Sequence, residues 1–166
     1  LHVAAHVYTL ADARQLIDDG VDILAHSVRD QPVDAAFVHD LIAHHTWYIP
    51  TLALDESFYL YAADPALLNS EFFRQAAGGQ LLATLQSPAY ASKTLSDPAT
   101  AQHLQDETIA RKNLMTLFNA GAQIAFGTDS GAAPGRIPGF SEHRELADLV
   151  SAGLTPAGCS AATLVV

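Results

Sequence analysis

The chain has 166 residues, of which 49% are hydrophobic and 16% are charged, which is typical of a folded globular domain rather than of a disordered or fibrous chain. Its net charge of −10 disfavours binding to nucleic acid or to an anionic membrane, because both need clustered Lys and Arg. The single cysteine, Cys159, excludes an internal disulfide and a cysteine-based zinc site. No stretch resembles a signal peptide or a membrane span, so we expect a cytoplasmic protein.

Short apolar strands and amphipathic helices alternate along the sequence. We predict strands over 1–6, 21–26, 46–51 and 123–128, and helices over 10–19, 33–45, 98–120 and 141–152, with a last helix beginning at Thr155-Pro156. Gly20, Gly121 and Gly153 fit the left-handed position that follows a helix C-terminus. This alternation predicts an α/β fold in which helices cover a parallel sheet.

The number of strand–helix units favours half of a closed barrel over an open sheet. Four units make about half of a closed (β/α)₈ barrel, which needs roughly 250 residues. An open doubly wound sheet is the alternative. Residues 52–97 form the longest excursion, and we predict a helical insertion there within a single domain over 1–166. Connections of this length often form lids or binding elements, although for any single residue in it plain packing on the barrel is the favoured explanation.

Three of the predicted strands end in a polar residue. His6 ends the first strand, His26 the second and Asp129 the fourth, each after an apolar run. The C-terminal ends of parallel strands meet on one face of the sheet, where α/β proteins build their active sites. Two imidazoles and a carboxylate suit a divalent metal such as zinc. Each residue alone is more often a structural hydrogen-bonding or turn residue, but three at one edge indicate a metal site.

The motifs that carry these residues resemble a known family. "VAAHVYT", "DILAHSV" and "IAFGTDSG" are similar, in that order and spacing, to the fifth, sixth and eighth strands of the amidohydrolase superfamily, in its imidazolonepropionase-like and dipeptidase-like branch. The stretch "PGFSEHRELADLVSAGLTPAGCSAAT" resembles the segment that follows the last strand there. The resemblance covers nearly the whole chain and implies the C-terminal half of a distorted (β/α)₈ barrel.

The resemblance also implies roles for the three strand-end residues. His6 and His26 match the two histidines that bind the metal in such enzymes, and Asp129 matches the aspartate that contacts metal and hydrolytic water and shuttles the proton. The chemistry is consistent, because a divalent cation lowers the pKa of its water and polarises the scissile carbonyl. A carboxylate within hydrogen-bond reach can then pass the proton to the leaving nitrogen.

Part of the family's ligand set is absent from these residues. The family's first strand carries a His-x-His pair, which does not occur here, and many members have a carboxylated lysine on the fourth strand. Lys93 and Lys112 fall in predicted helices instead. We therefore expect the remaining ligands upstream of Leu1, with one or two zinc ions in the parent protein and weak metal binding by this chain alone.

Six further residues follow the strand ends and are candidates for the substrate site. They are Tyr8, Arg29, Thr51, Ser130, Arg136 and His143. Tyr8 and Arg29 could meet a substrate carboxylate or carbonyl, with a plain loop role as the alternative, and for His143 a place on an ordinary helix face is the alternative. Four other histidines lie on predicted helices away from this edge and are expected to face solvent. They are His39, His44, His45 and His103.

These features predict a metal-dependent hydrolase of carbon–nitrogen bonds. The resemblance favours cyclic amides or dipeptides as small-molecule substrates. Two alternatives are a half barrel that has lost catalysis and a small-molecule binding domain built on a doubly wound sheet. A half barrel would leave sheet edges open, so we expect the chain on its own to dimerise, aggregate or be partly molten.

Overall fold

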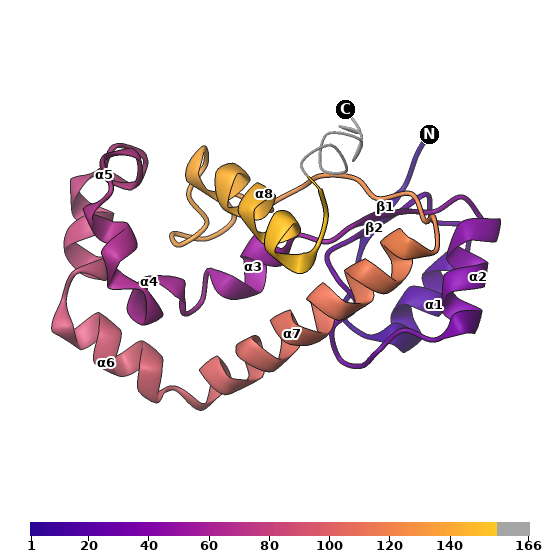
Figure 1. Ribbon diagram of the computed structural model, residues 1–166, viewed down its shortest axis with the longest axis horizontal. Helices are drawn as coiled ribbons and strands as arrows, with labels where there is room; N and C mark the ends of the chain where they lie inside the picture. The colour runs from indigo at the N-terminus through magenta and orange to yellow at the C-terminus, as the bar shows by residue number, and fades with distance from the viewer. Residues whose placement is uncertain (156–166) are drawn as a thin grey trace.

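Three short parallel strands form the sheet in the computed structural model, which describes residues 1–155 (Figure 1). They are β1 (Ala4–His6), β2 (Ile23–Ala25) and β3 (Trp47–Ile49). They lie in the order β1-β2-β3, and Tyr48 of β3 forms a further parallel bridge with Ile124. A doubly wound sheet reverses its strand order at a switch point, whereas a barrel adds its strands in sequence. The described strands show no such reversal, as expected for a segment of a barrel, and the α/β fold with parallel strands is confirmed.

The expected strand over 123–128 is shorter than predicted. The amide of Tyr48 donates to the carbonyl of Gln123 and the amide of Ala125 donates to the carbonyl of Tyr48, both at 2.9 Å, and the pairing then stops. Gly127 lies so close to β3 that a Cβ there would come within 2.6 Å of Ile49 Cγ2. The backbone then turns left-handed at Asp129, with φ of 54°, so the ladder cannot continue.

The four predicted helices outside the insertion are present within a few residues of their expected bounds. They are α1 (Leu10–Asp18), α2 (Ala35–Ala43), α7 (Pro98–Asn119) and α8 (Phe140–Ala152). The side chains of Thr9, Asp34 and Asp97 accept hydrogen bonds from the first turns of α1, α2 and α7, as N-caps do. No helix in the described range is long and apolar enough to cross a membrane. The expected helix from Thr155-Pro156 falls beyond the described residues.

The main hydrophobic core lies between the strands and the helices that cover them. Its centre is made by side chains from β2, β3, α1, α2 and α7 that are almost completely buried: Ala13, Ile17, Leu24, Phe37, Leu41, Tyr48, Leu114 and Leu117. On each helix these residues recur every three or four positions, which is the spacing of one helical face. This core fixes the strand ends on which the candidate site depends.

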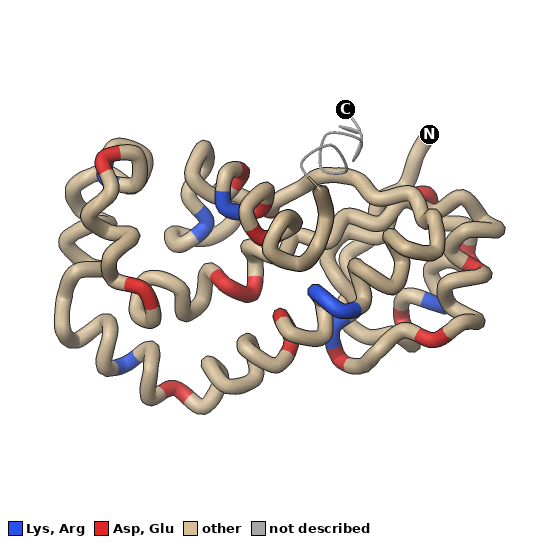
Figure 2. Tube along the Cα trace, viewed as in Figure 1, with Lys and Arg blue, Asp and Glu red and all other residues tan. Residues whose placement is uncertain are grey.

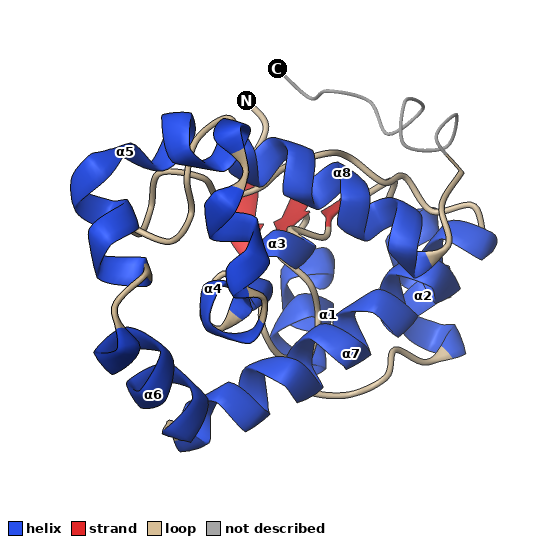
Figure 3. Cartoon of the chain, turned by 60° about the vertical axis from the view of Figure 1, so that its left-hand side comes forward, coloured by secondary structure: helices blue, strands red, loops and turns tan. Residues whose placement is uncertain are grey.

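The insertion is helical, as predicted, and forms a second core. It consists of α3 (Leu52–Glu56), α4 (Leu60–Ala63), the 3₁₀ helix η1 (Pro65–Asn69), α5 (Glu71–Leu85) and α6 (Pro88–Ser96). In Figure 1, α4, α5 and α6 lie away from α1 and α2, and α7 extends between the two groups; Figure 3 shows α5 and α6 on the opposite side of the molecule from α2. Ile137 and Phe140 pack into this core beside Tyr61 and Phe73. Because Ile137 and Phe140 follow Asp129 in sequence, the insertion anchors the segment that leads away from the candidate site.

A network of buried charges joins α3, α7 and α8, and Figure 2 marks acidic and basic positions along these helices. It contains four carboxyl groups and two guanidinium groups: Glu56, Glu107, Glu145, Asp148, Arg111 and Arg144. Burial raises the pKa of Glu145 to about 8, and burial together with the charge of Glu56 raises that of Asp148 to about 7. Burial thus makes ionisation of these two acids less favourable than in water, which reduces the negative charge beside the two arginines.

These raised pKa values predict that the protein loses stability as the pH rises from 6.5 to 8. The pKa values of Glu145 and Asp148 are 4.5 and 3.8 in the unfolded chain but about 8 and about 7 in the folded protein. The folded state therefore binds more protons than the unfolded state in this pH range, and the free energy of unfolding falls as the pH rises. His26 has the opposite effect, because burial lowers its pKa in the folded protein to about 4. This effect ends at pH 6.5, the pKa of an ordinary histidine, above which both states hold His26 neutral. Thermal unfolding followed by circular dichroism should show a falling Tm above pH 6.5.

Two variants separate this effect from general charge effects. Glu145→Gln removes the titrating group and should flatten the decline in Tm. Glu71→Gln changes an exposed acid of α5 and should keep the wild-type slope. A Tm that rises between pH 6.5 and pH 8 in the wild-type chain would contradict the prediction.

Candidate metal centre

The two candidate histidine ligands are neighbours at the C-terminal ends of adjacent strands. His6 ends β1 and His26 follows β2, and the register pairs His6 with Ala25. Nδ1 of His6 lies 2.6 Å from Nε2 of His26, and the ring centroids are 4.6 Å apart. Two imidazole nitrogens on one tetrahedral zinc ion lie roughly 3.3 Å apart at the usual zinc–nitrogen distances. The two nitrogens would therefore need to move apart by less than about 1 Å to share an ion.

His26 is held as a neutral imidazole. Burial lowers its pKa to about 4, and the charges of His6, Arg29 and Arg136 act in the same direction, while the carboxylate of Asp129 opposes them. Its Nδ1 lies 2.8 Å from Oγ1 of Thr51, which fixes the orientation of the ring. Metal ions bind the neutral form of histidine, and a hydrogen bond to the second ring nitrogen is the usual support for such a ligand.

Asp129 lies beside this pair and is itself paired with a cation. Its carboxylate accepts from Arg136 Nη1, and its charge acts on the pKa of His26. Three of the four described non-glycine residues with positive φ are His26, Thr51 and Asp129, at 76°, 46° and 54°. For a β-branched residue such as Thr51 this conformation is strained, and backbone strain of this kind gathers at functional sites.

Ser130 and His143 lie at different places around Asp129. The hydroxyl of Ser130 donates to Glu142 Oε1 at 2.5 Å, and the hydroxyl of Thr128 donates to the same oxygen at 3.0 Å. Glu142 therefore ties the strand-end segment to the first turn of α8. His143 is exposed, with Nδ1 2.8 Å from the carbonyl of Gly139 and its ring edge-on to Phe72. These contacts link Ser130 to the strand end and place His143 against the insertion instead.

A second group of potential ligands lies nearby, from α3 and α7. Asp55, His103 and Asp106 each offer one ligand atom, and these atoms all lie within 4.8 Å of one another. Nδ1 of His103 is buried without a hydrogen bond, 3.4 Å from Asp55 Oδ1. This buried group could hold a metal ion.

The expectation that His103 faces solvent was wrong, because α7 turns it inward, whereas His39, His44 and His45 are exposed as expected.

Arg29 and Tyr8 belong to this second group rather than to the histidine pair. Nε of Arg29 lies 2.8 Å from Asp55 Oδ2, and the hydroxyl of Tyr8 donates to Asp106 Oδ2 at 3.0 Å. Gln102 Nε2 donates to the other Asp106 oxygen at 2.6 Å. The carboxylates therefore have partners already, and a cation bound here would meet the positive charge of Arg29.

The two groups are joined by an aromatic ring and by the backbone. Phe58 stacks on His103, with centroids 4.1 Å apart and planes 9° apart, and the guanidinium of Arg136 lies 5.9 Å from the Phe58 centroid. Arg29 Nη1 donates to the carbonyl of Ser27, the residue after His26, at 2.9 Å. One polar region thus extends from the histidine pair to α7, with Phe58 and Arg29 as its links.

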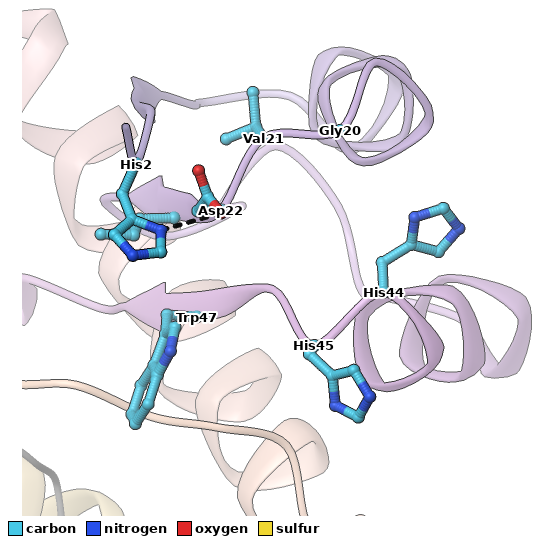
Figure 4. Close-up of a pocket in the computed structure, with 8 residues that line it drawn as sticks. His2, Gly20, Val21, Asp22, His44, His45 and Trp47 are labelled. Carbon is cyan, nitrogen blue, oxygen red and sulfur yellow. Dashed lines mark hydrogen bonds and ion pairs between the residues drawn. The ribbon is translucent and has the colours of Figure 1, made fainter.

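A separate pocket of about 310 Å³ lies at the opposite ends of the strands (Figure 4). His2 and Asp22 line it, with His2 Nδ1 3.1 Å from Asp22 Oδ1, together with Trp47. Figure 4 shows the rings of His44 and His45 directed away from Asp22. The histidines of this pocket therefore do not converge on a shared point, and the pocket stands apart from the strand-end residues.

Sequence reasoning did not identify the buried acids of α3, α7 and α8. Asp106, Glu107, Ala110, Leu114 and Leu117 are the buried positions of one face of α7, where Asn113 also lies. Acidic residues in phase with an apolar helical stripe were thus visible in the sequence, and this was the available signal. Their partners, which come from other helices, left no local pattern.

Two solved structures of hydrolases are similar to this one over nearly the whole chain. The structure is similar to that of a Xaa-Pro dipeptidase with methionine bound in its active site, at a TM-score of 0.60 and 20% identity over 98% of this chain and 32% of that one. It is also similar to a bottromycin amidohydrolase, at a TM-score of 0.55 and 21% identity over 98% of this chain and 39% of that one. No family model and no curated protein matches the sequence. The chain thus has the fold of a part of such hydrolases and spans about a third of their length, which confirms the expected structural resemblance.

Proposed function

We propose that this chain supplies the last four strand positions of an amidohydrolase barrel that hydrolyses a carbon–nitrogen bond in a small substrate. The observation that carries the proposal is the contact between His6 and His26 at adjacent strand ends, with Asp129 close enough to act on the pKa of His26. The barrel-like strand order and the two structural relatives support it. The remaining ligands would come from the part of the barrel that these relatives have and this chain does not span.

Each residue has a distinct part in the proposed reaction. His6 and His26 would hold a divalent ion, for which we propose zinc, and the bound ion would polarise the scissile carbonyl and acidify the attacking water. Asp129 takes a proton from that water on its carboxylate and delivers it to the leaving nitrogen. Arg136 pairs with Asp129 and orients its carboxylate. Thr51 fixes the imidazole of His26.

The substrate contacts are proposed from the same region. Arg29 and Tyr8 lie together, with the guanidinium 4.8 Å from the centroid of the Tyr8 ring, and both have polar atoms suited to a substrate carboxylate or carbonyl. Dipeptides and cyclic amides carry these groups next to the bond that is broken. We therefore propose them as the substrate classes, with Ser130 and His143 as further candidates nearer α8 and with the insertion over 52–97 as a lid.

A second metal location follows from the group of Asp55, His103 and Asp106. Its buried ligand atoms favour it, since two carboxylates and an imidazole are a common ligand set for divalent ions. The ion pair between Arg29 and Asp55 disfavours it, because an ion at Asp55 would be repelled by the guanidinium. We therefore assign the primary ion to the histidine pair.

Zinc titration of single variants tests this assignment. His6→Ala and His26→Ala should each weaken zinc binding by more than the roughly 10–100-fold that loss of an outer-shell partner costs. Asp106→Asn should leave it nearly unchanged, and His39→Ala, an exposed position of α2, serves as the control. The reverse pattern, with Asp106→Asn as the damaging change, would move the ion to the second location. Binding that none of the substitutions alters would contradict both.

A further inference from the structure

The N-terminus of α3 is capped in an unusual way. Thr51 occupies the N-cap position in a left-handed conformation, with φ of 46° and ψ of 52°, and its side chain makes no cap hydrogen bond. A threonine at this position ordinarily turns its hydroxyl to the amides of its own helix. Here Oγ1 of Thr51 lies 2.8 Å from Nδ1 of His26 instead. The first amides of α3 therefore need another acceptor.

Glu145 of α8 supplies that acceptor. Its side chain is fully buried, Oε2 accepts from the amide of Ala53 at 2.7 Å, and the nearby amide of Leu52 also acts to lower the pKa of the carboxyl group. These two residues follow Thr51 directly. A carboxyl group from a distant helix thus does what the hydroxyl of Thr51 would otherwise do. The arrangement links α8, the start of α3 and the imidazole of His26 in one chain of contacts.

We propose that Glu145 is a positioning residue for the candidate metal centre: it caps α3 from α8 and so leaves the Thr51 hydroxyl free to orient His26. Without this acceptor, we expect the Thr51 hydroxyl to turn to the amide of Ala53, as an N-cap threonine ordinarily does, and His26 would lose its hydrogen bond. The inference rests on the proposed function only in the role it gives to His26. The geometric link from Glu145 to Thr51 stands independently of metal binding.

The surroundings of Glu145 define the variants that test it. Burial raises its pKa to about 8, with the charge of Asp148 adding to the rise and the Leu52 and Ala53 amides and Arg111 opposing it. A neutral carboxyl and a glutamine amide present the same carbonyl oxygen to the amide of Ala53. Glu145→Gln should therefore preserve the cap, whereas Glu145→Leu fills the space and removes the acceptor. Glu145→Asp withdraws the acceptor by one methylene and is the milder change.

The imidazole signals of His26 in nitrogen-15 NMR spectra report the effect without any metal. Thr51→Val should shift the Nδ1 signal of His26, because the hydrogen bond is lost. Glu145→Leu and Glu145→Asp should shift it in the same direction, and Glu145→Gln should leave it at the wild-type position. The double variant Thr51→Val/Glu145→Leu should show no larger shift than Thr51→Val alone, because both changes remove the same contact.

A matched control separates positioning from general destabilisation. Asp148→Asn disturbs the same buried network one helical turn away, without contact to α3 amides, and should leave the His26 signal unchanged. A wild-type His26 signal in Glu145→Asp and Glu145→Leu, while Thr51→Val shifts it, would overturn the proposal. An additive shift in the double variant would also overturn it.

Zinc titration of the same variants distinguishes this inference from the proposed function. Zinc affinity should fall roughly 10–100-fold in Glu145→Leu and in Thr51→Val, as for other outer-shell partners, and should be retained in Glu145→Gln. A complete wild-type barrel that binds no zinc would contradict the metal-dependent function, and the NMR shifts would then decide the role of Glu145 by themselves. Zinc binding that is equal in the wild-type and Glu145→Leu chains would overturn the positioning role.

Discussion

Asp129→Asn should lower kcat by roughly 10²–10⁴-fold in the complete barrel, which is the usual contribution of a general acid–base group. The asparagine amide cannot take a proton from the attacking water, so the leaving nitrogen receives none. The backbone should tolerate the change, since Asn adopts the left-handed conformation at φ of 54° as readily as Asp. The loss is therefore expected in the chemical step and not in the fold.

Steady-state kinetics on dipeptides and cyclic amides, with zinc content and circular dichroism measured on the same samples, test this expectation. Asp18→Asn removes an exposed carboxylate of α1 and should leave kcat unchanged. Turnover near the wild-type value in Asp129→Asn would remove the proton-transfer role from Asp129. A variant that has also lost its zinc would assign Asp129 to ligation rather than to proton transfer alone.

Arg111→Met should lower the free energy of unfolding by about 3–5 kcal/mol, the usual loss when one partner of a buried ion pair is removed. Arg111 Nη2 lies 2.6 Å from Glu107 Oε1 and 2.8 Å from Asp148 Oδ1, and Nη1 donates to the Asp148 carbonyl at 3.0 Å. Both carboxylates are buried and would be left without this cation. Methionine fills most of the volume, so the loss reports charge and hydrogen bonding more than packing.

Urea denaturation of Arg111→Met and of Lys112→Met measures the free energy of unfolding of each variant. Lys112 is the next residue on α7 and is exposed, so its replacement should change stability by less than about 0.5 kcal/mol. The loss in Arg111→Met should be smaller below pH 7, the approximate pKa of Asp148, because a protonated Asp148 no longer needs a counter-charge. Equal losses in the two variants would show that the buried network contributes nothing specific.

The helices and the alternation with parallel strands followed from local patterns in the sequence. The spacing of Ala13 and Ile17 in α1, and of Leu114 and Leu117 in α7, is set by residues a few positions apart, and caps such as Thr9 are equally local. The strand over 123–128 was predicted too long because pairing needs a partner. Only the approach of Gly127 to Ile49 and the turn at Asp129 decide where that pairing ends.

The sequence by itself also predicted that His6, His26 and Asp129 lie at one edge of the sheet, since parallel strands present their C-terminal ends together. Tertiary structure alone decided what surrounds them: Arg136 on Asp129, Thr51 on His26 and Glu145 at the start of α3. Glu145 is 92 residues from Ala53, and nothing in either local stretch specifies the other. Periodicity reports which face of an element is buried, whereas the partner of a buried polar group is fixed only when distant elements pack together and leave it no water to bind.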